Sequence, residues 1–201
     1  MNDTVLIGLC GRSGSGKGYV SSVFSSFGGY HIDTDAVYHD LLLPRNGEMS
    51  ECTRAIADEF GDDVISNGTV DRGALSSIVF SDRERLETLN GIAHAYILKE
   101  TRRLVGECGA PFAVVDAPLL IESGFDRLCS FTVCVVADDE TCISRICRRD
   151  GVSREDALRR LSNQISADEL VARCDYSIDN SLGRDVARDV KKILIEKGLI
   201  K

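Results

Sequence analysis

Residues Gly11 to Gly18 have the types and the spacing that bind phosphate groups. The chain reads Gly-Arg-Ser-Gly-Ser-Gly-Lys-Gly there, which supplies both glycines and the lysine of a P-loop. Glycines let successive backbone N–H groups turn toward one anion, and the helix that follows points the positive end of its dipole at it. The predicted nucleotide-binding residues are therefore Gly11, Arg12, Ser13, Gly14, Ser15, Gly16, Lys17, Gly18 and Tyr19.

The last position of this motif departs from the pattern. Gly18 stands where a Ser or Thr hydroxyl would coordinate Mg²⁺. Because Mg²⁺ keeps several waters and is also held by nucleotide phosphates, we expect a weaker metal site, with a rate roughly ten- to a hundredfold lower. A flexible Gly/Ser connection with an incidental lysine is the alternative interpretation of the segment.

The flanking residues favour the phosphate-binding interpretation. Residues 4–10 are almost continuously apolar, as in a strand buried on both faces of a parallel sheet. After the loop, Val20, Val23, Phe24 and Phe27 have the spacing of one helix face, and the glycines at 28 and 29 end that helix. A strand, a glycine-rich loop and a helix in this order form the setting that the motif requires.

Three carboxylates follow predicted strands. Asp33 and Asp35 lie at the end of the second one, and Asp116 ends the third. Ligands of open parallel sheets gather at this edge, so one carboxylate could take a proton from an attacking hydroxyl, and Asp33 or Asp116 could hold Mg²⁺. Alternatively, one of the first pair is a helix N-cap, which we expect of Asp35 more than of Asp33. Leu119, three residues after Asp116, would line the site.

Six arginines gather in sixteen residues of this acidic chain, at positions 145, 148, 149, 154, 159 and 160. They predict a lid that brings positive charge to the phosphates during phosphoryl transfer. The alternative is a solvated helix face with local ion pairs. We expect Arg145 and Arg149 to bind the nucleotide.

The periodicity predicts an α/β fold, because strands alternate with helices. The expected strands cover residues 4–10, 30–33, 112–116, 131–136 and 176–179. Asp71, the Ser81-Asp82-Arg83-Glu84 capping box, Asp138 and Ser153 can begin helices. We expect a nucleotide-binding core at 1–35, 112–140 and 166–201, a helical acceptor-binding insertion at 36–111 and a lid at 141–165.

Composition narrows the function classes. A net charge of −8 disfavours nucleic acid as a general partner, and no apolar run has the length of a membrane span. Eight cysteines without C-x-x-C spacing and without a secretory signal indicate a reduced, cytoplasmic protein. Cys10, Cys134 and Cys147 lie in apolar patterns and are expected in the core.

Taken in order, these motifs resemble the dephospho-CoA kinase family over almost the whole chain. The resemblance is carried by Ile7-Gly8-Leu9, the loop, Ile32-Asp33-Thr34-Asp35, Phe60-Gly61, Val70-Asp71-Arg72, Leu75, Val79-Phe80, Leu89-Asn90, His94, Val115-Asp116-Ala117-Pro118-Leu119-Leu120, Glu122, Arg145, Arg149-Asp150, Gln164, Asp175 and Asn180. It implies a P-loop NTPase core with a five-stranded parallel sheet flanked by helices, a helical substrate-binding insertion and a helical lid.

The resemblance also implies an activity, the phosphorylation of the ribose 3′-hydroxyl of dephospho-CoA with ATP and Mg²⁺ in a monomer or weak homo-oligomer. It implies Asp33 as the base, with Lys17 and Arg145 stabilising charge and Arg149 on the lid side of the nucleotide. The implied substrate-binding residues are Asp33, Asp35, Arg72, His94, Asp116 and Leu119.

Several positions differ from the family's usual residues. Gly18 and Tyr19 replace Ser and Thr, Arg12-Ser13 replaces Gly-Ile, Ala95 replaces a proline, and Cys142 replaces a frequent Gln. Two other functions therefore stay open, a P-loop kinase for another small acceptor and a nucleotide- or CoA-binding protein with impaired catalysis. A GTPase is disfavoured, because the chain has no Asn-Lys-x-Asp motif.

Overall fold

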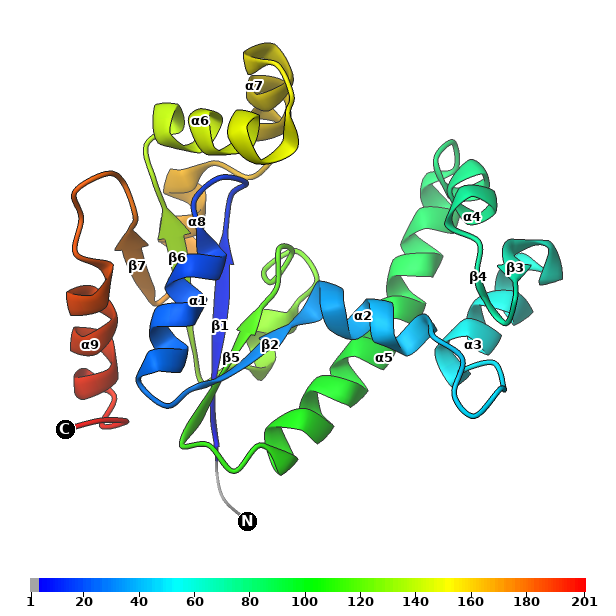
Figure 1. Cartoon of the computed structure of the whole chain (residues 1–201), viewed down its shortest axis with the longest axis horizontal. Helices are drawn as coiled ribbons and strands as arrows, with labels where there is room; N and C mark the ends of the chain where they lie inside the picture. Colours follow the sequence, from blue (N-terminus) through cyan, green and yellow to red (C-terminus); the bar gives the residue numbers. More distant parts are fainter. Residues whose placement is uncertain (1–3) are drawn as a thin grey trace. The chain divides into compact units, whose positions relative to one another are not determined.

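A computed structural model describes residues 4–201, which divide into two compact units (Figure 1). The first contains the chain up to Ile32 together with Val105–Lys201, and the second is Asp33–Leu104. No helix within residues 4–201 is both long enough and apolar enough to cross a bilayer.

The first unit is built on a five-stranded sheet in the order β2-β5-β1-β6-β7. Its strands are β1 (Val5–Gly11), β2 (Tyr30–Asp33), β5 (Phe112–Asp116), β6 (Phe131–Val136) and β7 (Tyr176–Asp179). β1 pairs in parallel with β5 and β6, and β6 pairs in parallel with β7. The predicted α/β class and all five predicted strands are confirmed, the first shifted by one residue.

Helices cover both faces of this sheet. Side chains at alternate positions of a strand point to opposite faces, so Ile7 and Leu9 of β1 face one side with Val133 and Val135 of β6. These four are fully buried with residues of α1 (Lys17–Ser26) and α9 (Val186–Glu196). Figure 1 shows α1 and α9 on that face and α8 (Ala167–Arg173) on the other, where Cys10 and Cys134 lie.

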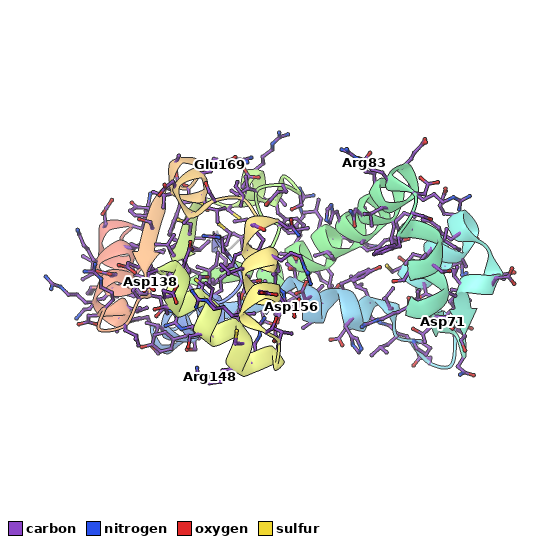
Figure 2. All side chains as sticks on the ribbon, turned by 90° about the horizontal axis from the view of Figure 1, so that it is seen from above. Asp71, Arg83, Asp138, Arg148, Asp156 and Glu169 are labelled. Carbon is purple, nitrogen blue, oxygen red and sulfur yellow. The ribbon has the colours of Figure 1, made fainter. Side chains whose placement is uncertain are left out.

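The segment after β6 forms two helices, α6 (Asp139–Asp150) and α7 (Arg154–Ser162). Both predicted caps are confirmed, because Asp138 accepts from the Thr141 N–H and Ser153 accepts from the Asp156 N–H. Asp138 and Asp156, labelled in Figure 2, mark the two starts. The helices share a small core with Ile143, Ile146 and Leu161. A short 3₁₀ turn, η2 (Phe125–Leu128), lies between β5 and β6.

The second unit is mostly helical, as the sequence predicts. It contains α2 (Thr34–Leu42), α3 (Glu51–Phe60), the 3₁₀ turn η1 (Asp62–Val64), β3 (Ile65–Ser66), β4 (Thr69–Val70), α4 (Arg72–Val79) and most of α5 (Arg83–Glu107). Its core gathers Leu42, Ile56, Phe60, Val64 and Leu75 among others. The β3–β4 hairpin was not predicted.

Two expectations about local structure in this unit are wrong. The carboxylate of Asp82, and not Ser81 as the capping-box pattern suggested, accepts from the first amides of α5, those of Glu84 and Arg85. Likewise Asp33, and not Asp35, is the N-cap of α2. Because β2 ends at Asp33 and a helix starts at Thr34, strand alternation does not place Asp33 and Asp35 on one side.

Candidate active site

The loop between β1 and α1 leaves its helix N-terminus available to an anion. Gly16 is the N-cap of α1 in the left-handed conformation, with φ 88°, and it has no side chain to cap the helix. The first turn of α1 contains no acidic residue, so nothing there competes for the amides and the dipole. Lys17 Nζ donates to the carbonyl of Gly11 at 3.2 Å. Ser15 Oγ is buried with no hydrogen-bond partner within residues 4–201.

Close packing explains why glycines occupy this loop. A Cβ atom at Gly14 would lie 2.4 Å from the carbonyl oxygen of Cys142, and one at Gly16 would lie 2.2 Å from Asn180 Nδ2. Both residues also have positive φ, of 78° and 88°. Any side chain would therefore push the loop away from α6 and from the residue after β7.

Arg145 and Asn180 hold the loop in shape. Arg145 Nη1 donates to the carbonyls of Gly14 and Ser15 at 3.2 and 3.1 Å, and its Nη2 donates to the carbonyl of Asn180 at 2.9 Å. Asn180 Nδ2 donates to the carbonyl of Ser15 at 2.7 Å. These hydrogen bonds occupy carbonyls of the loop, and among its amides the Ser15 N–H donates to the Arg12 carbonyl at 3.1 Å. In this structure Arg145 thus contacts the loop's backbone, which makes it a positioning residue.

The unusual Arg12-Ser13 pair connects the loop to α6 and to the end of α7. The Arg12 guanidinium bridges Asp139 Oδ1, at 2.9 Å, and the carbonyl of Leu161, at 3.3 Å. The Ser13 N–H donates to Gln164 Oε1 at 2.9 Å. The departure from the family's Gly-Ile at these positions therefore adds a contact between the loop and the predicted lid segment.

Most of the predicted arginine cluster is paired locally. Arg149 donates to Asp150 at 2.6 and 2.9 Å, and Arg160 also contacts that carboxylate. These hydrogen bonds hold the pKa of Asp150 well below its usual range. Arg154 and Arg159 pair with Glu140 and Asp156, while Arg148 is exposed (Figure 2). Local pairing of this kind is what the helix-face alternative expects.

Asp116 ends β5 at the edge of the sheet from which the loop emerges. In the β1–β5 register it lies opposite Leu9, two residues before Gly11. Leu119 follows it in an exposed position. Within residues 4–201 no cluster of three or more His, Cys, Asp or Glu side chains is arranged to hold a metal ion. Asp116 is a carboxylate of the kind that Mg²⁺ accepts, since this ion is usually held by one or two carboxylates together with substrate phosphates and water.

Of the six predicted acceptor-side residues, Asp116 and Leu119 belong to the first unit and the other four belong to the second. Asp33 is exposed, and its Oδ1 accepts from the N–H groups of Asp35 and Ala36 at 2.9 and 3.2 Å. Arg72 is the exposed first residue of α4. His94 lies half-buried on α5, and this burial lowers its pKa below 6.5. At neutral pH its imidazole is therefore uncharged.

Comparison with known proteins identifies the family of this chain. Residues 5–185 match the family model for dephospho-CoA kinase. The chain belongs to the dephospho-CoA kinase family. A family member from Corynebacterium glutamicum is 34% identical over 195 residues, covering 94% of this chain and 96% of the relative. Another, from Symbiobacterium thermophilum, is 39% identical over 187 residues and covers 91% and 77%. The protein is accordingly a kinase, a transferase of phosphoryl groups.

Solved structures show the same fold. The crystal structure of TT1252 from Thermus thermophilus is 29% identical, with a TM-score of 0.80 over 96% of this chain and 97% of that one. The dephospho-CoA kinase from Campylobacter jejuni is 25% identical, with a TM-score of 0.65 over 97% and 98%. A shikimate kinase from Acinetobacter baumannii, 16% identical with a TM-score of 0.53 over 100% and 97%, shares the fold alone.

Asn180 and Gln164 are among the residues that carry the family resemblance, but their contacts with the loop were not predicted. Both lie far from the loop along the chain, and only the fold brings them to Ser15 and Ser13. One signal was present for Asn180, because it directly follows a strand at the edge where ligands of parallel sheets gather. Gln164 follows the end of α7 and offers no comparable signal.

Proposed function

We propose that this protein transfers the γ-phosphoryl group of ATP to the ribose 3′-hydroxyl of dephospho-CoA. Membership of the dephospho-CoA kinase family carries this proposal. The loop at Gly11–Gly18 supports it, because that loop offers amides, a helix N-terminus and Lys17 to a polyphosphate.

The nucleotide half of the mechanism uses the first unit. Amides of the loop and of the first turn of α1 bind the β- and γ-phosphates, and Lys17 moves from the Gly11 carbonyl to the phosphate oxygens. Arg145 and Asn180 keep the amides oriented by binding the loop's carbonyls. Arg149 binds the nucleotide after exchanging Asp150 for a phosphate. Asp116 would hold Mg²⁺ on the protein side, and the ion would supply positive charge to the transferring group.

The acceptor half uses the second unit. Asp33 is the general base, and its N-cap hydrogen bonds fix the carboxylate through Oδ1. Its Oδ2 takes the proton of the 3′-hydroxyl as that oxygen attacks the γ-phosphorus. The bond from phosphorus to the bridging oxygen breaks, and ADP leaves. Asp35, Arg72 and His94 of this unit bind the acceptor, with His94 as a neutral hydrogen-bonding group. Leu119 of the first unit also contacts the acceptor.

Asp33→Asn tests the role of the base separately from the fold. Asn is as good an N-cap as Asp, so α2 keeps its cap, while the amide cannot accept the proton. We expect kcat to fall about 10²- to 10⁴-fold, with the melting temperature almost unchanged. The measurement is turnover of ATP and dephospho-CoA, followed by mass spectrometry of the product.

Asp71→Asn is the matched control. Asp71 caps α4 with the same geometry, accepting from the amides of Gly73 and Ala74 at 2.8 and 3.0 Å. This variant should retain its rate. Equal rates for Asp33→Asn and the unmodified protein would remove Asp33 from the chemistry. A lack of turnover in the unmodified protein at high concentration would refute the proposed activity itself.

The location of the protein is also a proposal. We infer a cytoplasmic enzyme from its substrates, and its eight free cysteines support a reducing compartment. Fractionation of cells followed by immunodetection would test this.

A further inference from the structure

Three cysteines from separate parts of the chain meet beneath the phosphate-binding loop. Cys10 of β1 lies directly opposite Cys134 of β6 in the parallel register, so their side chains point to the same face of the sheet. Cys174 ends α8, which packs on that face. Its Sγ lies 3.5 Å from Cys10 Sγ. Nothing in the proposed phosphoryl transfer uses these thiols.

The three thiols differ in exposure. Cys10 and Cys134 are 1% and 0% exposed, whereas Cys174 is partly exposed. A small oxidant in solution can therefore reach Cys174 first. A disulfide needs its sulfurs about 2.0 Å apart, so the Cys10–Cys174 pair would have to close by about 1.5 Å. Side-chain rotation and a small backbone shift can cover a distance of that size.

The surroundings favour the thiolate at Cys174. Hydrogen bonds from the thiols of Cys10 and Cys134 lower the pKa of Cys174. The same contacts, together with burial, raise the pKa of Cys10 and of Cys134. The reactive form of a cysteine is the thiolate, and Cys174 is the residue of the three that is both partly exposed and favoured as a thiolate.

We propose that Cys174 is an oxidation site that forms a reversible disulfide with Cys10 and thereby weakens nucleotide binding by the loop. The oxidant is a hydroperoxide. The Cys174 thiolate attacks one peroxide oxygen and becomes a sulfenic acid, while the other oxygen leaves and is protonated to an alcohol, or to water when the oxidant is hydrogen peroxide. The Cys10 thiol loses its proton as its sulfur attacks the Cys174 sulfur, and the sulfenic hydroxyl takes up a proton and leaves as water. Two thiol groups of a reductant then restore both cysteines and are themselves oxidised to a disulfide.

The bond would act on the loop because its Cys174 end is restrained. Asp175, the next residue, accepts from Thr132 N and Oγ1 at 2.7 and 2.9 Å, and its own N–H donates to Thr132 Oγ1 at 3.1 Å. These contacts limit how far Cys174 can move, so part of the movement falls on Cys10, which directly precedes Gly11.

Gly11 has little room to absorb that movement. A Cβ there would lie 2.5 Å from the Val135 carbonyl and 2.8 Å from Ser15 Oγ. Lys17 Nζ also donates to the carbonyl of Gly11, the residue after Cys10. A shift of Cys10 therefore reaches both the loop backbone and its cation. The effect on binding rests on the proposed function, whereas the disulfide itself does not.

The experiment treats the reduced, full-length protein with hydrogen peroxide, alkylates it under denaturing conditions and maps its peptides by mass spectrometry. We expect two fewer alkylated thiols than in the reduced protein and a linked peptide pair containing Cys10 and Cys174. ATP affinity, measured by calorimetry on the same samples, should fall about tenfold and recover with dithiothreitol.

Two variants separate the site from general oxidation. Cys174→Ser should form no such link and keep its ATP affinity after peroxide, while Cys147→Ser, at another partly exposed cysteine, should behave like the unmodified protein. A full set of alkylated thiols after peroxide treatment, or a disulfide between other cysteines, would refute the proposed disulfide between Cys10 and Cys174. A Cys10–Cys174 disulfide that leaves the ATP affinity unchanged would refute the proposed effect of this disulfide on nucleotide binding. Failure of the reduced protein to bind ATP would instead count against the proposed function.

Discussion

Gly18 is the residue at which the chain departs most directly from the P-loop pattern, and the structure leaves room to restore a side chain there. It is the exposed second residue of α1, and a Cβ atom would meet nothing within 4 Å. Its neighbours therefore do not require glycine. If Mg²⁺ binds as we propose, the missing hydroxyl would leave one of its coordination positions to water.

We expect Gly18→Ser to raise kcat/KM at limiting Mg²⁺ by about tenfold, because a hydroxyl ligand replaces a water. The measurement is a Mg²⁺ titration of the kinase rate at fixed ATP and dephospho-CoA.

Gly91→Ser is the matched control for that change. Gly91 is also an exposed helical glycine whose Cβ would meet nothing within 4 Å, but it lies on α5. Both substitutions should stabilise a helix by a few tenths of a kcal/mol up to about 1 kcal/mol, and only Gly18→Ser should change the Mg²⁺ dependence. An unchanged dependence in Gly18→Ser would show that the hydroxyl has no role here.

At the scale of elements, Asp175 connects β6 to the start of β7. Its hydrogen bonds with Thr132 lower the pKa of the Asp175 carboxyl. A depressed folded-state pKa contributes stability that is present above the unfolded value, about 3.9, and is lost as the pH falls through the folded value.

Asp175→Asn should therefore lower the free energy of unfolding by about 1 kcal/mol at pH 7, and the difference should vanish in acid below the folded-state pKa. Urea unfolding at a series of pH values measures this. Asp58→Asn, at an exposed aspartate of α3, should leave the pH dependence as it is. A difference that persists in acid would mean that the side chain acts by packing and not by its charge.

The elements of the first unit were predictable because their signals are local. Apolar runs located all five strands, and Asp138 and Ser153 marked two helix starts. The β3–β4 hairpin carried a signal that was overlooked, the Asn67-Gly68 pair with φ of 51° and 75°, which suits a tight hairpin turn. Asp33 was misjudged because a strand end and a helix cap can occupy the same residue.

The candidate site was predictable only in part, for a different reason. The loop itself is a continuous motif, so its residues follow from sequence alone. The partners that shape it do not, because Arg145 and Asn180 are 131 and 165 positions away from the loop residues they contact. Residue types cannot show whether an arginine faces a phosphate or a backbone carbonyl. That choice depends on how α6 and β7 pack.

At the scale of the whole molecule, the two units should respond to different ligands. A non-hydrolysable ATP analogue should slow amide hydrogen exchange at residues 11–20 and near Asn180 in the first unit. Dephospho-CoA should slow exchange within Asp33–Leu104. Exchange measured by mass spectrometry with each ligand alone tests this division.

Adenosine is the control ligand, since it lacks the phosphates that the loop would bind, and it should leave exchange at residues 11–20 unchanged. Slower exchange with dephospho-CoA only in the first unit would contradict an acceptor-binding role for Asp33–Leu104.

The hydrogen bond from the Ser13 amide to Gln164 affects when a nucleotide binds to the loop and leaves it. The Ser13 N–H is a single donor, so it cannot make a full hydrogen bond to Gln164 and to an incoming anion at the same time. The two acceptors therefore compete for it. A ligand that accepts the hydrogen bond from the Ser13 N–H therefore frees Gln164 and the chain after α7. By thermodynamic reciprocity, a movement of Gln164 away from Ser13 increases the affinity of the loop for the anion. When Gln164 accepts from the Ser13 N–H again, the loop loses a donor to the nucleotide, and this would favour release of ADP.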